Sequence, residues 1–430
     1  MLTRNLEHYL FRRYIYNIID PFVFFFIATF SFSAADIVFL YQLDYIKQYY
    51  LVQFFLSQLL FIAGYYLFRP YQKIYSKNPK KVLTETMLSL KKIKILFYIT
   101  SGLYVLSQLL VYKISGIPLL MDSRFEVFAG GTGIGVLSRI IDVVGFLATL
   151  ILFLNIFYKK VRFLNIITMW CFLLIFTIFN ILSGSKMAVL TMIYIGFYAY
   201  LSGNIIPLLN KNISNIIKRY LYSGILLAFI GAIVILVIQY NNTQKLNEGL
   251  LNTDVKEEVY MGVLTRFIMN GDIYIAAYPN STIEKMLKPD SFTILLSDIF
   301  YSLRLMSREE KIPQLGQQLY NYLNPKSDLL MGPTTHFGIF SYFNYGYFGS
   351  LVFSFISGIL LSFVINKSLQ LFKKNLFYLT MYSLLAYTIL IFPLNPIIGI
   401  GKLFNILIVL PFLILVTNFI NMYRRKKYVR

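Results

Sequence analysis

The chain has 430 residues, of which 57% are hydrophobic and 18% are aromatic. Soluble domains are about 45–50% apolar, so this composition excludes an ordinary soluble protein and predicts an integral membrane protein. The formal net charge of +21 would suggest nucleic acid in a soluble protein, but here the charges must first be placed relative to the bilayer. Cys171 is the only cysteine and the two histidines are far apart, which argues against disulfides and against a thiolate or histidine metal site.

Long apolar blocks predict about ten membrane-spanning helices. The first block, 21–41, is too long for a signal-peptide core and lacks a clear cleavage site, so we expect it to be retained. A hydrocarbon core about 30 Å thick needs about 20 helical residues. On that criterion nine more spans follow, at 51–68, 95–114, 139–157, 164–182, 187–202, 221–239, 338–366, 376–394 and 403–421. The predicted fold class is therefore an all-α polytopic membrane protein.

The spans divide the chain into three parts. Transmembrane helices occupy 1–239 and 338–430, and the segment 240–337 between them is mostly too polar for lipid. With the N-terminus in the cytoplasm, 25 of the 40 lysines and arginines fall on inner segments, whereas 240–337 has nine basic and eleven acidic residues. Basic loops are retained on the cytoplasmic side, so both termini are expected inside and the long loop outside. Topology and anionic lipid then account for the positive charge, and no nucleic-acid partner is needed.

The outward loop is expected to be folded. Residues 264–278 and 291–306 carry apolar side chains at mixed three- and four-residue spacing, which predicts short amphipathic helices on the outer membrane surface. Asp36, late in the first span, is costly in lipid and must face protein or water, so it is a candidate for lining a cavity.

Outward-facing cations are informative because the topology rule does not supply them. Lys186 follows Gly184 and Ser185 in a turn between two spans, and is either a snorkelling side chain or a charge aimed at a phosphate. Arg124 precedes the glycine run 130–135, which lacks the Gly-Lys-Ser/Thr ending of a nucleotide loop and is more typical of a mobile lid. An acidic neighbour could equally neutralise Arg124.

Three more residues complete the candidate set. Arg139 stands three positions before Asp142, so it is either an anion ligand or the partner of that carboxylate on one helix face. Arg266 has no acidic residue within three positions, which favours an anionic ligand. His336 closes the outward loop and is a general base or hydrogen-bond donor, or else an interfacial histidine without a chemical role. The aromatic run 337–348 after it predicts an interfacial belt, although aromatic faces also stack on sugars.

Together these features resemble a known family. The span set, the single large outer loop, the Gly184-Ser185-Lys186 turn and the His336-Phe337-Gly338 exit before an aromatic helix resemble the Wzy-type oligosaccharide repeat-unit polymerases of bacterial O-antigen and capsule synthesis. In layout the chain is also similar to O-antigen ligases. The resemblance covers nearly the whole chain, and it consists of architecture and a few short motifs.

The resemblance implies a glycosyltransferase of the bacterial cytoplasmic (inner) membrane. Such an enzyme moves a growing glycan from undecaprenyl diphosphate onto a sugar hydroxyl of a new lipid-linked repeat unit, at the outer face and without metal, nucleotide or other cofactor. His336 and Arg266 are then expected to be catalytic, and Lys186, Arg124 and Arg139 to hold the diphosphate. Lys186 replaces an arginine common in such proteins and keeps the charge without the bidentate fork. Implied partners are lipid-linked glycans, membrane lipids, a chain-length regulator and a flippase.

Two alternative functions stay open. A flippase or other transporter of lipid-linked oligosaccharide would also be polytopic, but transporters often contain internal repeats and paired broken helices, and no convincing repeat is present. A ligase would pass the finished glycan to lipid A or to another final acceptor.

Overall fold

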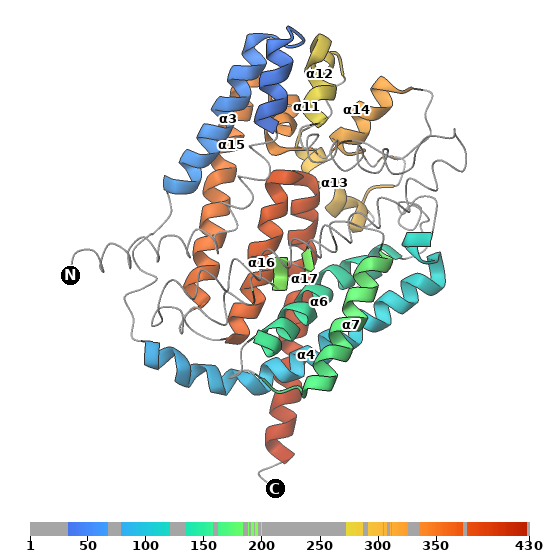
Figure 1. Ribbon diagram of the computed structural model, residues 1–430, viewed down its shortest axis with the longest axis vertical. Coiled ribbons are helices and arrows are strands. Elements are labelled where there is room, and N and C mark those ends of the chain that lie inside the picture. The colour runs from blue at the N-terminus through green and yellow to red at the C-terminus, as the bar shows by residue number, and fades with distance from the viewer. Residues whose placement is uncertain are drawn as a thin grey trace, which may run out of the picture.

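The protein is all-helical: in the computed structural model, every regular element among the described residues is a helix (Figure 1). This agrees with the predicted fold class. The structure describes residues 33–67, 79–120, 134–157, 162–183, 188, 191–192, 194–196, 199, 272–286, 291–303, 305–307, 310, 312–325, 333, 335–372 and 376–427.

Long helices form the body of the described part. They are α3 (Gln48–Leu67), α4 (Pro79–Ser115), α6 (Ile134–Phe157), α7 (Ile166–Leu182), α15 (Phe337–Phe372), α16 (Leu376–Leu394) and α17 (Pro396–Lys427). Helix α15 is interrupted at Gly346, where the backbone is not helical (φ +71°, ψ −170°), so it consists of two helical parts. Shorter elements are η1 (Pro118–Leu120), α11 (Asp272–Ala277), η4 (Pro279–Ser281), α12 (Thr282–Lys285), α13 (Ser291–Ser302) and α14 (Leu315–Leu323). Each long helix overlaps a predicted span. Of the other predicted spans, 21–41 is described from residue 33 as a helix over 33–42, 187–202 only at scattered residues, and 221–239 lies outside the described residues.

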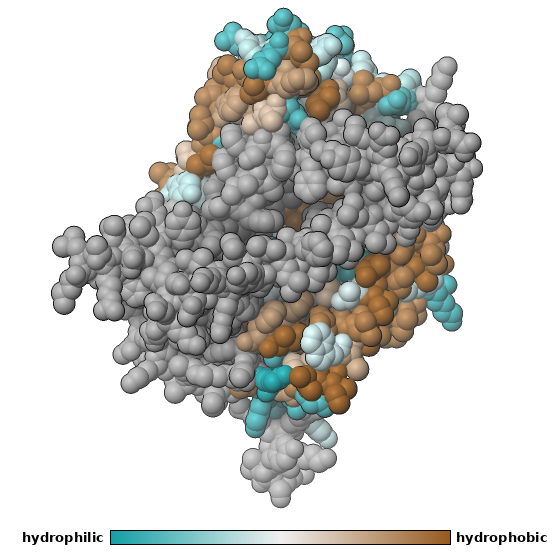
Figure 2. Space-filling view, in the orientation of Figure 1, coloured by the Kyte–Doolittle hydropathy of each residue, from teal (hydrophilic) through white to brown (hydrophobic). Residues whose placement is uncertain are grey.

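Five of the described helices are long and apolar enough to cross a membrane. They are Gln48–Leu67, Leu90–Leu120, Gly135–Phe157, Phe337–Phe363 and Pro396–Tyr423. Large apolar side chains are exposed on these helices and on α7, among them Leu59, Ile167, Leu174, Val352 and Phe412. Figure 2 shows hydrophobic residues over much of the coloured surface, with hydrophilic residues gathered at its ends. Apolar residues on the outer faces of long helices are what a bilayer solvates well, which supports a membrane protein.

Helices α3 and α15 form the closest helix pair, because glycines let their backbones touch. A Cβ placed on Gly64 of α3 would lie 2.2 Å from the carbonyl oxygen of Phe355, and one on Gly358 of α15 would lie 2.1 Å from the carbonyl oxygen of Phe61. Small residues at such crossings allow van der Waals contact and interhelical hydrogen bonds, which drive helix association in lipid. The two glycines therefore fix how deeply the helices approach.

A polar seam continues this contact toward the start of α3. Gln53 donates to the hydroxyl oxygens of Ser57, at 3.0 Å, and of Ser350 on α15, at 2.9 Å. Its carbonyl oxygen accepts from the Tyr278 hydroxyl at 3.0 Å. One buried amide thus links α3, α15 and the segment between α11 and η4, and its hydrogen-bonding groups are used.

The second group of helices packs around a separate apolar core. Buried side chains from α4, α6, α7, α16 and α17 meet there, including Phe97, Leu147, Phe176, Met381 and Leu413. In Figure 1, α4, α6 and α7 run obliquely across the lower part of the view, while α3 and α15 lie side by side at its left. Helix α13 joins the two groups, because Ile294 packs with Phe340 of α15 and Ile397 of α17.

The short helices between residues 272 and 323 pack against the long helices. Ile273 and Tyr274 of α11 are completely buried with α3 and α15, so the described part of the predicted helix over 264–278, residues 272–278, packs on these helices, and its place on the membrane surface stays a prediction. Helix α13 falls within the predicted 291–306 and is half-buried. Helix α14 was not predicted, and its Gly316 N–H donates to the Thr335 hydroxyl at 3.2 Å, which ties it to the segment before α15.

Two further sequence expectations are corrected by burial. The run 337–348 forms part of the protein core at Phe337, Phe340 and Phe343, while Phe348 is 80% exposed, so only part of it can serve as an interfacial belt. The predicted span 403–421 begins too late, because Lys402 already lies inside α17. Asn395 accepts a hydrogen bond from the Ile398 N–H at 3.2 Å and Pro396 follows it, so the helix begins seven residues earlier than predicted.

The glycine contact generates a stability prediction. Replacing Gly64 or Gly358 by Ala should destabilise the protein by about 1–3 kcal/mol, because even one methyl group overlaps the backbone of the facing helix. The effect is measured by heating the purified protein in detergent and determining, by size-exclusion chromatography, how much folded protein remains at each temperature. Gly102→Ala on α4 is the matched control, since nothing lies within 4 Å of its Cβ position and alanine favours a helix. Equal behaviour of all three variants would mean that α3 and α15 are not in backbone contact.

Candidate functional site

His336 is buried at the point where the chain begins α15. Its side chain is 6% exposed, and its backbone carbonyl accepts the first helical bond, from the Phe340 N–H at 2.9 Å. The imidazole Nδ1 lies 3.4 Å from the Ser33 hydroxyl, and the Tyr274 ring stands edge-on to it with centroids 5.7 Å apart. The histidine is therefore held between the first described helix, α11 and α15.

Burial determines the charge of His336. Desolvation disfavours the imidazolium and lowers the pKa of His336 to about 4. The ring is therefore neutral at physiological pH, with one nitrogen carrying a proton and the other free to accept one. A neutral imidazole is the form that a general base requires.

Other polar groups converge on the start of α15. The Tyr274 hydroxyl is buried and has no hydrogen-bond partner among the described residues. A Cβ on Gly338 would lie 3.4 Å from that hydroxyl and 3.9 Å from the amide nitrogen of Gln58, so both groups lie beside this glycine. An unpaired buried hydroxyl costs free energy unless water or a ligand satisfies it. Together with His336, these groups form a small polar site beneath the loop helices.

A tyrosine cluster around Glu284 is connected to this site through Tyr278, whose ring centroid lies 5.4 Å from that of Tyr274. The carboxylate accepts hydrogen bonds from Tyr49 of α3 at 2.5 Å and from Tyr342 of α15 at 2.9 Å. Tyr50 stacks on Tyr278 with centroids 4.5 Å apart. Burial tends to raise the pKa of Glu284, but the tyrosine hydrogen bonds outweigh it and lower that pKa below its usual value. An ionised Glu284 therefore joins α12 to both helices of the closest pair.

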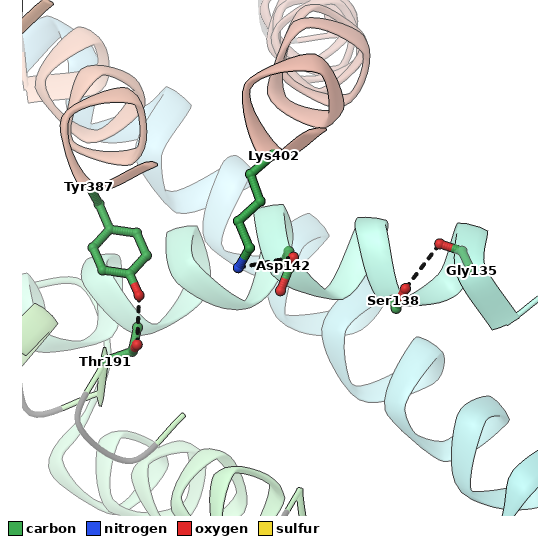
Figure 3. Close-up of polar contacts among 6 residues, drawn as sticks. All are labelled: Gly135, Ser138, Asp142, Thr191, Tyr387 and Lys402. Atoms are coloured by element: carbon green, nitrogen blue, oxygen red, sulfur yellow. Dashed lines mark hydrogen bonds and ion pairs between the residues drawn. The ribbon is translucent and has the colours of Figure 1, made fainter. Parts of the chain in front are cut away.

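A second polar site lies between α6, α16 and α17 (Figure 3). Lys402 of α17 points toward α6, and its Nζ lies 3.3 Å from Asp142 Oδ2. Both residues lie within candidate membrane spans. Charged groups at membrane depth are costly, are usually paired, and mark functional sites by default.

Hydroxyl groups extend the second site. The oxygens of Tyr387 and Thr191 lie 2.6 Å apart, and the Tyr387 ring stacks on Phe146 with centroids 4.9 Å apart. Beside Lys402 is a cavity of about 20 Å³, which is room for about one water. It is lined by Asp142, Val143, Leu384, Tyr387, Thr388, Lys402, Asn405 and Ile406.

The structure places only part of the predicted catalytic and binding set. His336 and Arg139 are described, whereas Arg124, Lys186 and Arg266 lie outside the described residues. Arg139 lies on the first turns of α6, one helical turn before Asp142. The alternative that Arg139 pairs with Asp142 is wrong for this structure, because the carboxylate is paired with Lys402.

Several residues of both sites were not predicted from the sequence. Tyr274, Gln58 and Glu284 resemble ordinary loop or span residues, and only packing brings them together. Lys402 could have been recognised, because Asn395 and Pro396 are a helix-start signal that places this lysine on the second turn. Among the described residues no group of three or more His, Cys, Asp or Glu is placed to hold a metal.

Comparisons with models of protein families, with curated proteins and with solved structures found no match for this chain.

The buried His336 predicts a specific acid sensitivity. Its pKa is about 6.5 when unfolded and about 4 when folded, so protons bind the unfolded chain more strongly as the pH falls. Protonation of this residue should therefore lower the free energy of unfolding by about 3 kcal/mol as the pH falls from 6.5 to 4. The thermal midpoint of His336→Gln in detergent should therefore fall less over that range than the midpoint of the unaltered protein. His8→Gln is the control. If the thermal midpoints of His336→Gln and of the unaltered protein change equally with pH, the imidazole is solvated and the prediction is wrong.

Loss of the Glu284 carboxylate should loosen the loop helices. Glu284→Gln replaces two charge-assisted hydrogen bonds with weaker neutral ones, so hydrogen exchange of residues 272–286 should accelerate by about tenfold. Mass spectrometry of the exchanged protein measures this rate. The adjacent exposed residue offers the matched variant Lys285→Gln, for which we expect no change. Unaltered exchange in Glu284→Gln would show that other contacts hold α11 and α12.

Proposed function

We propose that this chain is a membrane glycosyltransferase that polymerises undecaprenyl-diphosphate-linked oligosaccharide repeat units into O-antigen or capsular polysaccharide. The observation that carries the proposal is the buried, neutral His336 between Ser33 and Tyr274, at the start of an apolar helix and beneath folded loop helices. A proton acceptor that is shielded from water suits the attack of a sugar hydroxyl on a lipid-linked donor.

The proposed topology has ten spans, both termini inside and the segment 240–337 at the outer face of the bacterial cytoplasmic membrane. Five described helices are long and apolar enough to span, and α7 and α16 are apolar as well. The arrangement of the ends supports the orientation. The C-terminal end of α17, which carries Arg424 to Lys427, lies at the end of the molecule opposite α11, α12 and α14 (Figure 1).

The reaction is a transfer between two lipid-linked glycans. The acceptor hydroxyl oxygen forms a bond to the anomeric carbon of the donor, and the bond from that carbon to the diphosphate oxygen breaks. The electron pair leaves with the diphosphate, and the hydroxyl proton passes to the free nitrogen of His336. A diphosphate near the imidazole stabilises the imidazolium and raises its pKa, so the substrate itself makes His336 a stronger base.

Cationic side chains have the second role in this proposal. The leaving diphosphate needs positive charge, which Arg266, Lys186, Arg124 and Arg139 would supply without a metal. The partners are the lipid-linked donor and acceptor, membrane lipids, a chain-length regulator and a flippase. The tyrosine cluster around Glu284 offers hydroxyl groups and aromatic faces of the kind that bind sugars.

Deleting the gene tests the activity. Surface glycan should then consist of cores capped by one repeat unit, because units are still made and exported but not joined. An unchanged distribution of glycan length would discard the proposal. Repeat units accumulating on the inner leaflet would favour a flippase, and long chains left on the carrier would favour a ligase.

Substituting His336 tests the assigned base. His336→Asn should lower polymerisation by about 10²–10⁴-fold, because general base catalysis is lost while a polar side chain still fills the site. Glycan length in complemented deletion cells gives the readout, and equal protein in the membrane fraction shows that insertion is intact. His8→Asn should behave like the unaltered protein. Normal polymers from His336→Asn would make this histidine structural.

A further inference from the structure

The ion pair between Lys402 and Asp142 is not assigned a role by the proposed reaction. It joins α17 to α6 across a membrane-embedded interface, at a cost that well-packed apolar residues would avoid. A structural pair of this kind is expected to be sealed and short, since its hydrogen bonds must compensate for lost hydration. The geometry of this pair differs from that expectation.

The pair is open on one side. The Nζ to Oδ2 distance of 3.3 Å is longer than the about 2.7–2.9 Å of a strong charge-assisted hydrogen bond. The Lys402 side chain is 31% exposed and that of Asp142 is 46% exposed, although both lie in a crevice between helices. Each group therefore keeps hydrogen-bonding capacity for a further partner that reaches the crevice.

The crevice lies near one end of the helix pair that forms it. Lys402 is the seventh residue of α17 and Asp142 the ninth of α6, so they lie about 9 Å and about 12 Å from the starts of these helices. In the proposed topology both starts face outward. The two charges would then lie just below the level at which the phosphates of an outer-leaflet lipid are found.

The chemistry of the lining suits a phosphate oxygen. Lys402 offers a compact positive charge, and the hydroxyl of Thr388 and the amide of Asn405 offer neutral donors on α16 and α17. Asp142 opposes an anion as long as it stays at the crevice. However, Arg139 stands one turn earlier on the same helix, at a spacing that allows the carboxylate to pair with it instead.

We propose that Lys402 is a further diphosphate-binding residue and that Asp142 is its placeholder. Without ligand, Asp142 neutralises the lysine and keeps it stable at membrane depth. The cavity has room for about one water, so only one oxygen of a diphosphate reaches into it and binds Lys402; Asp142 then turns to Arg139, and no charge is left unpaired. The proposal rests on the proposed function for the identity of its ligand, a polyprenyl diphosphate.

The two partners of the pair should have opposite effects on binding. We would titrate the purified full-length protein in detergent with geranylgeranyl diphosphate and follow binding as thermal stabilisation. Lys402→Met should weaken binding by at least about tenfold. Asp142→Asn should strengthen it several-fold, because the competitor for the lysine is removed. Lys113→Met, at the exposed end of α4, is the matched control and should bind like the unaltered protein.

Two additional ligands identify what is recognised. Geranylgeraniol has the same chain without phosphates, and sodium pyrophosphate has the phosphates without a chain. Stabilisation by both diphosphates but not by the alcohol supports a diphosphate site. If the alcohol binds as well as geranylgeranyl diphosphate, the crevice does not recognise phosphate and the proposal fails.

The remaining outcomes separate a structural pair from a placeholder. Equal weakening by Lys402→Met and Asp142→Asn would overturn the proposal, because a structural pair loses its function whichever partner is removed. Undiminished binding in Lys402→Met would overturn it as well. If Lys402→Met does not fold, the double variant Lys402→Met with Asp142→Leu removes both charges together and must fold without binding. These measurements do not use glycan synthesis, so they can succeed or fail independently of the proposed polymerase activity.

Discussion

The site around His336 is organised by the backbone contact between α3 and α15 at Gly64 and Gly358. In lipid, apolar side chains gain little by leaving one apolar surrounding for another, so close approach and hydrogen bonds must hold helices together. The glycines permit the approach, and Gln53 adds hydrogen bonds to Ser350 and Tyr278. The first residues of α15, before the interruption at Gly346, lie against α3 as well, where Phe337 stacks on Phe61 with ring centroids 4.7 Å apart.

That geometry creates a place for a buried histidine. Because α15 starts against α3, the residue before it is enclosed by the first described helix, α11 and the loop segments above. His336 loses water on every side, and its pKa falls accordingly. Glu284 then joins α12 to both helices through tyrosine hydroxyls, so the short helices next to the site are attached to the long helices that form it.

The two polar sites follow different physical rules. Around His336, neutral groups meet in a nearly dry environment, and their unsatisfied hydrogen-bonding capacity is the property available to a substrate. Between α6 and α17, opposite charges are held at membrane depth with part of their surface still open. Helix α13 packs against the starts of both α15 and α17, so the two sites are connected through one short helix.

The membrane character, the all-helical class and the approximate position of the long helices could be predicted from the sequence, because apolar composition and block length are local properties. The sequence also singled out His336 by its rarity and its place at the end of the outward loop. The partners of His336 could not be predicted, since Ser33 and Tyr274 are far away in the chain and meet it only through the contact of α3 with α15. The pairing of Asp142 with Lys402 instead of Arg139 could not be predicted either. Arg139 is close to Asp142 in the sequence, but Lys402 reaches the carboxylate only when α17 packs against α6.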